Sequence, residues 1–295
     1  MNMTAIILLV LKASIILSVF AIGLKATFAD ATSLFRHPGH LFRALLSMNV
    51  LMPLTALAIG APFNLHPAVK IALVVISVSP IPPVLPNKAL KAGGKDDYTI
   101  GLLVATPVVS IILIPITIAI FEKITDVSLA LPARSVAVLV FTTILAPLLI
   151  GIAVQKIAHT IADRAAKPIA VLASVLLILS ALPVLIGLAR TVFSLIGDGT
   201  ILTLVSFALV GFIVGHLLGG PEPDNRPVLA LATASRHPAV ALAIAHANFP
   251  EQKLAVPAVF LYVILSGILS ALYLLWVKRQ RAGNALAEFK KSLKA

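Results

Sequence analysis

The stretch that decides the fold is Ala230-Leu-Ala-Thr-Ala-Ser-Arg-His-Pro-Ala-Val-Ala-Leu-Ala-Ile-Ala-His-Ala-Asn248. It is apolar and long enough to span a membrane, yet Arg236, His237 and Pro238 stand near its middle. Proline removes a backbone hydrogen bond, so the helix is expected to break there and to leave carbonyl groups in need of donors. An ionisable pair in hydrocarbon must face protein, water or a ligand. Secondary transporters build substrate sites from such broken helices.

The composition is that of an integral membrane protein. Of the 295 residues, 60% are hydrophobic and only 12% are charged, whereas a soluble domain carries about 25% charged residues. The chain has no cysteine, which excludes disulfides and thiolate metal sites, and we expect no metal or other cofactor. The net charge of +12 is scattered over short loops and the C-terminal tail. It therefore predicts no nucleic-acid partner, and the basic tail is expected to meet anionic lipid headgroups.

The apolar runs predict an all-α fold with nine spans. We expect these spans at about residues 4–24, 41–61, 68–93, 97–121, 134–156, 168–189, 200–219, 227–248 and 253–277. This arrangement leaves sixteen Lys and Arg residues on one side of the membrane and five on the other. The bias predicts that the N-terminus lies outside and the C-terminus in the cytoplasm. We expect the protein in the cell (inner) membrane, with a basic cytoplasmic tail at 278–295.

A second break is expected in the third span, at Pro80-Ile-Pro-Pro-Val-Leu-Pro86. With Pro80, Pro82, Pro83 and Pro86 in seven residues, no helix can continue. The third span should therefore consist of two half-helices, at about 68–79 and 87–93. It runs in the direction opposite to the eighth span, as the two halves of an inverted-topology repeat do. A small ligand could be held where the two breaks cross.

Several short motifs carry a family resemblance through their order and spacing, from about residue 10 to residue 277. They are Phe35-Arg-His-Pro38, Met52-Pro53, the Pro-rich break near residue 80, Gly93-Gly94, Ala245-His-Ala-Asn-Phe249 and Val256-Pro257. In these the chain resembles the bile acid:sodium symporter family. The resemblance implies two inverted repeats, two crossing discontinuous helices, and a version of the fold that lacks the first helix. It further implies one transmembrane unit over 1–277, with a panel at about 4–24 and 134–189 and a core at about 41–121 and 200–277.

The resemblance also implies where sodium ligands would lie. The Ser-Asn pair that follows the first crossover in the family falls on Leu85 and Pro86, and the hydroxyls of the next helix fall on Thr99 and Leu103. The Glu, Gln and Asn of the second crossover fall on Ala232, Arg236 and His237, and the Gln of the second span falls on Met48, beside Asn49. A guanidinium about 4 Å from sodium would repel it by about 4 kcal/mol at intermediate dielectric. We therefore expect no sodium at these positions.

The candidate binding residues flank the two breaks. They are Arg236, His237, Ser235, Thr233, Asn49, Ser79, Asn87, Lys88 and Thr99, with Pro80, Pro82, Pro83, Pro86 and Pro238 as the structural crossover. Arg236 is expected either to bind an anionic substrate or to cap carbonyls freed by Pro238. His237 either carries a proton, which would couple transport to protons, or makes a structural hydrogen bond. Lys88 either faces the cavity or extends to the membrane surface.

These features predict a secondary transporter of a small organic anion by alternating access, with sodium independence expected. One alternative is a membrane protein that binds or senses a ligand without moving it. A membrane-embedded enzyme is the other alternative, but the chain has no His-Glu-x-x-His motif, no Asp pair within a span and no Gly-x-Ser-x-Gly elbow. We therefore expect no enzyme activity. The identity of the anion, the direction of transport and the oligomeric state stay open at this point.

Overall fold

The computed structural model describes residues 3–60, 65–83, 85–91, 93–125 and 133–292, and these residues form helices and short connections without a strand. The fifteen α-helices of this part of the chain are α1 (Met3–Gly23), α2 (Phe28–Ala31), α3 (Ser33–Arg36), α4 (Pro38–Leu45), α5 (Met52–Gly60), α6 (Pro67–Val78), α7 (Leu85–Lys91), α8 (Asp96–Thr125), α9 (Ala133–Val140), α10 (Ala146–Ile157), α11 (His159–Ser194), α12 (Thr200–Leu218), α13 (Asn225–Ala234), α14 (Pro238–Asn248) and α15 (Ala255–Ser292). Two π-helical segments, η1 (Leu46–Leu51) and η2 (Phe141–Leu145), connect α4 to α5 and α9 to α10.

Seven helical segments of the described chain are long and apolar enough to cross a membrane. They are Pro38–Gly60, Asp96–Lys123, Arg134–Ile157, His159–Val184, Thr200–Leu218, Asn225–Asn248 and Ala255–Gly283. Two shorter apolar helices, Leu9–Gly23 and Pro67–Val78, lie where the first and third spans were predicted. The all-helical membrane architecture is confirmed, while the count of nine spans and the inverted repeat remain predictions.

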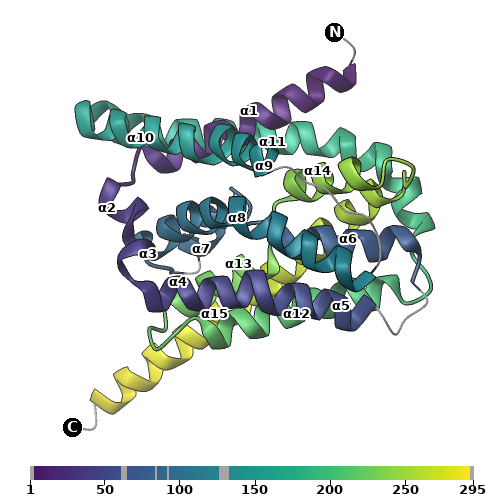
Figure 1. Cartoon of the computed structure of the whole chain (residues 1–295). Helices are drawn as coiled ribbons and strands as arrows, with labels where there is room; N and C mark the ends of the chain where they lie inside the picture. Colours follow the sequence, from purple (N-terminus) through teal and green to yellow (C-terminus); the bar gives the residue numbers. More distant parts are fainter. Residues whose placement is uncertain (1–2, 61–64, 84, 92, 126–132, 293–295) are drawn as a thin grey trace.

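The helices form three layers (Figure 1). Along the top of the view, α1 packs against α10 and α11, and α9 lies beside them. Helices α6, α7, α8 and α14 occupy the middle, and α4, α5, α12 and α15 lie along the bottom. The start of α1 and the end of α15 lie at opposite ends of the bundle (Figure 1).

Both predicted helix breaks are present. The first separates α6 from α7, close to the predicted half-helices, and the second separates α13 from α14 at Ser235–His237. Pro238 occupies the first turn of α14, where its missing N–H leaves no bond unmade. The same proline therefore ends one half-helix and starts the next.

The second broken segment is the most enclosed part of the bundle. In the most apolar stretch of Asn225–Asn248, 78% is buried within the protein. The corresponding share in His159–Val184 is 17%. The rest of the chain thus leaves most of this part of α11 uncovered, whereas α13 and α14 pack on protein. Neither long helix follows its predicted boundary, because α11 extends over His159–Ser194 and α15 continues beyond residue 277 to Ser292.

Glycines on α12 bring α13 close to it. A Cβ on Gly211 would lie 3.0 Å from Cα of Ala234, and one on Gly215 would lie 2.5 Å from Cα of Ala230. The spacing of four residues places both glycines on one face of α12, where small residues allow two backbones to approach closely. This contact fixes the end of α13, and with it the position of the second break.

Candidate functional site

The two helix breaks touch each other directly. The backbone N–H of His237 donates a 2.8 Å hydrogen bond to the carbonyl oxygen of Pro80. This bond joins the extended segment after α6 to the extended segment after α13. The predicted crossing of the two discontinuous helices is therefore a contact between backbones.

The first break leaves a carbonyl without its helical donor. In an α-helix the carbonyl of Ser79 would accept a bond from residue 83, and in a 3₁₀ turn it would accept one from residue 82. Both residues are prolines and carry no N–H. The Ser79 carbonyl is buried, so a donor must come from elsewhere in the protein.

Arg236 supplies that donor. Its Nη1 donates to the carbonyl oxygen of Ser79 at 3.0 Å, and its Nη2 donates to the carbonyl oxygen of Met48 at 2.9 Å. The side chain is 4% exposed. One guanidinium therefore connects three segments, namely the second break, the end of α6 and the π-helical segment η1.

Proline also explains why the Met48 carbonyl is available. Met48 lies within η1, where the donor five residues ahead would be residue 53. Residue 53 is Pro53, which has no N–H. The guanidinium thus bonds a carbonyl whose π-helical partner is missing.

The carbonyl freed by Pro238 has a different partner. In an unbroken α13 the carbonyl of Ala234 would accept a bond from residue 238, which is the proline. The hydroxyl of Tyr262, from α15, donates to this oxygen at 2.6 Å. The alternative expectation, that Arg236 caps a carbonyl freed by Pro238, is therefore wrong for the carbonyl of Ala234. Arg236 lies beyond the end of α13 and bonds carbonyls of other elements.

A third side-chain bond joins α13 to η1. The hydroxyls of Ser47 and Thr233 lie 2.6 Å apart and are both buried. Ser79 is held within its own element, because its hydroxyl donates to the carbonyl of Val75 at 2.6 Å. These bonds rigidify the crossing from both sides.

Several buried polar atoms near the crossing have no partner among the described residues. They are Nε of Arg236, the hydroxyl oxygen of Ser235, both ring nitrogens of His237 and Oδ1 of Asn49. Native proteins satisfy nearly all buried polar atoms, so a cluster of unsatisfied ones marks a place for water or a ligand. Three of these residues are consecutive in the second break.

The charge of Arg236 has no carboxylate partner in the described part of the chain. Two helix ends compensate it in part, because Ser79 and Ser235 are the C-caps of α6 and α13. The carbonyl ends of helices carry partial negative charge and favour a cation. The guanidinium therefore occupies the kind of position that a bound cation would occupy.

The positions of the expected sodium ligands are buried and mostly apolar. Leu85, Pro86 and Ala232 offer no side-chain oxygen. Thr99 lies on α8 beside Gly94, its hydroxyl buried and without a described partner. The side chains of Asn87 and Lys88 lie outside the described residues.

Comparison of the sequence with models of protein families assigns the chain to a family. The model of the sodium bile acid symporter family matches residues 13–196, which is more than half of the chain. The chain belongs to the sodium bile acid symporter family. None of the curated proteins that were compared matches it.

The family match covers the first break of this symporter-family protein and ends before the second. Sequence reasoning identified Arg236, His237 and Ser79 around the crossing, and the structure brings them together. It missed Tyr262 and Ser47. Ala234 stands four residues before a proline, which signals a freed carbonyl, but no sequence signal identifies a tyrosine 28 residues away as the donor.

Proposed function

We propose that this member of the sodium bile acid symporter family moves a small organic anion across the membrane by alternating access and without sodium coupling. The observation that carries the proposal is the position of Arg236. Its guanidinium bonds carbonyls of two other segments at the crossing of the helix breaks. It is a fixed cation in the place where the family is expected to bind a mobile one.

Sodium independence follows from the ligands and from charge. Sodium requires several oxygen ligands, and the carbonyls of Ser79 and Met48 already accept bonds from Arg236. The expected side-chain ligands are replaced at Leu85, Pro86 and Ala232. A second cation about 4 Å from the guanidinium would be repelled by about 4 kcal/mol at intermediate dielectric.

The anion preference follows from the atoms that stay unsatisfied. Nε of Arg236 has no partner among the described residues, and His237 stands at the N-cap position of α14 without a capping bond from its side chain. Helix N-termini and guanidinium groups both favour anions. A carboxylate or sulfonate at the crossing would satisfy these donors and balance a buried charge that no described carboxylate pairs.

Alternating access requires two bodies that move relative to each other. The layer of α1, α10 and α11 packs within itself, and α6, α13 and α14 carry the crossing. We assign the first group to the panel and the second to the core. Because Arg236 ties the crossing together permanently, the core moves as a rigid unit whether or not sodium is present.

Uptake by the purified protein in proteoliposomes tests the proposal. A panel of radiolabelled organic anions, beginning with taurocholate, is measured with a sodium gradient, with a proton gradient and with choline in place of sodium. We expect uptake that is equal in sodium and choline. If protons couple transport through His237, the proton gradient will accelerate it.

Two outcomes would contradict the proposal. Uptake that requires sodium would show that the guanidinium does not replace the metal ion. Saturable binding of an anion without any flux would favour a receptor over a transporter. Arg236→Ala and the exposed Arg134→Ala serve as a matched pair, because both remove one guanidinium and only the first lies at the crossing.

A further inference from the structure

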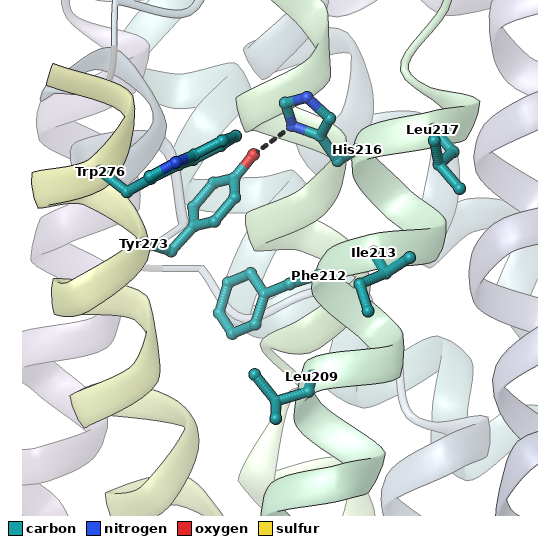
Figure 2. A pocket seen from close by; sticks show the side chains of 7 residues that line it. All are labelled: Leu209, Phe212, Ile213, His216, Leu217, Tyr273 and Trp276. Atoms are coloured by element: carbon teal, nitrogen blue, oxygen red, sulfur yellow. Dashed lines mark hydrogen bonds between the residues drawn. The ribbon is translucent and has the colours of Figure 1, made fainter. Parts of the chain in front are cut away.

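An apolar pocket of about 330 Å³ lies between α12 and α15, away from the crossing (Figure 2). Leu209, Ile213 and Leu217 form one of its walls and recur every four residues along one face of α12. Their side chains are 44%, 58% and 74% exposed. In a membrane-spanning helix these exposures mean contact with lipid, so the pocket opens to the bilayer.

Aromatic side chains form the other side of the pocket, toward α15 (Figure 2). Tyr273 stacks on Phe212 with ring centroids 5.0 Å apart, and Trp276 lies 5.6 Å from Tyr273. The hydroxyl of Tyr273 and Nδ1 of His216 lie 2.6 Å apart and satisfy each other (Figure 2). Because these two polar groups are paired, the pocket presents ring faces and carbon atoms to its occupant.

Two exposed arginines follow the pocket residues along the chain, one near the end of α12 and one on α15. Arg279 follows Trp276 by three residues on α15, which places it one turn further along nearly the same face, and it is exposed. On the other side, Nε of the exposed Arg226 donates to the carbonyl of Gly220, just beyond the end of α12. The nearby carboxylates are already engaged, Asp224 with Arg281 and Glu222 with His40.

We propose that this pocket binds an anionic phospholipid, with an acyl chain between α12 and α15 and the phosphate between Arg226 and Arg279. Tryptophan and tyrosine favour the headgroup level of a membrane, and the pocket lies near the end of the span Ala255–Gly283. Guanidinium groups bind phosphate in a bidentate manner. The proposal is independent of what the protein transports.

The only tryptophan of the chain, Trp276, makes the test direct. The full-length protein is placed in phosphatidylcholine bilayers that contain a minor fraction of lipid with brominated acyl chains. The bromine atoms quench tryptophan fluorescence on contact. Brominated phosphatidylglycerol is compared with brominated phosphatidylcholine at the same fraction. We expect stronger quenching by phosphatidylglycerol, with an apparent affinity about fivefold higher per basic residue that contacts the phosphate.

Two variants separate a built site from general attraction. Arg279→Gln should lose about fivefold of the preference for phosphatidylglycerol. Lys278→Gln removes the same charge one residue away, off the Trp276 face, and should retain the preference. Equal losses in both variants, or equal quenching of the natural protein by both lipids, would overturn the proposal. Quenching by neither lipid would show that a protein, such as a second copy of the chain, covers the pocket instead.

Discussion

Prolines create the unpaired carbonyl groups to which Arg236 donates hydrogen bonds. Pro53 removes the π-helical donor to the Met48 carbonyl, and Pro82 and Pro83 remove the donors to the Ser79 carbonyl. Arg236 bonds both oxygens while its own charge lies near the carbonyl ends of α6 and α13. Arginine suits this role because its planar fork reaches two acceptors at once and stays charged when buried.

Replacing Arg236 by alanine should destabilise the protein. Each buried carbonyl left without a donor costs about 1–3 kcal/mol, and relief of the buried charge offsets part of that loss. Arg236→Lys should lose less stability, since it keeps the charge but cannot bridge both carbonyls. Unfolding temperatures followed by the fluorescence of Trp276 will measure these effects.

The exposed Arg134 provides the control for this comparison. Arg134→Ala removes the same group at the start of α9 and should leave the unfolding temperature unchanged. If Arg236→Ala is as stable as Arg134→Ala, the two carbonyls find other donors and the bridging role assigned to the guanidinium is wrong.

The sequence was sufficient to locate this site but not to identify its hydrogen-bond partners. The density of prolines near residue 80 and the lone Pro238 were sufficient to predict both breaks, because a missing N–H is a local property. Which donor reaches which freed carbonyl depends on how distant helices cross. Ser79 and Arg236 are 157 residues apart in the chain, and Ala234 and Tyr262 lie on different helices.

At the scale of elements, the contact between α12 and α13 holds the second break in place. Gly211 and Gly215 face α13 so closely that even a methyl group would meet backbone atoms. The bonds of Ser47 to Thr233 and of Tyr262 to Ala234 then fix the end of α13. The small residues thus allow α12 and α13 to approach closely, and the hydrogen bonds determine where α13 ends.

Gly215→Ala should therefore displace α13 and lower stability by about 1–3 kcal/mol, as overpacking does. The added Cβ would lie 2.5 Å from both Cα of Ala230 and the carbonyl oxygen of Leu229. Thermal unfolding of the purified protein will measure the loss. Gly187→Ala is the control, because nothing lies within 4 Å of its Cβ position, and alanine stabilises an open helical site by about 0.5–1 kcal/mol. A Gly215→Ala protein as stable as the control would refute the close contact.

Element boundaries were harder to predict than element identity. The sixth predicted span lies within α11 and the ninth overlaps α15 from Ala255 onward, but both helices continue beyond the apolar runs. Hydrophobicity indicates where a helix is in lipid and not where its hydrogen bonding ends. The π-helical segments η1 and η2 were not predicted, since nothing in their sequences apart from the prolines that follow distinguishes them from the α-helical parts of a span.

At the scale of the whole molecule, the excess of Lys and Arg on one side predicts the orientation of the chain. The natural chain has no cysteine, so single-cysteine variants can report it without a background. Asp198→Cys, in the exposed turn before α12, should react with a membrane-impermeant maleimide in intact cells. Gln280→Cys, in the exposed last part of α15, should react only after permeabilisation. The reverse labelling pattern would invert the assignment of the two sides.

Sodium titration tests, without knowledge of the substrate, whether the guanidinium of Arg236 occupies the place of a metal ion. An ion that binds the folded protein raises its unfolding temperature as the ion concentration increases. We expect the unfolding curves of the natural protein in sodium chloride and in choline chloride of equal ionic strength to coincide. A saturable rise in the unfolding temperature that is specific to sodium would contradict the claim that Arg236 occupies the place of the metal ion.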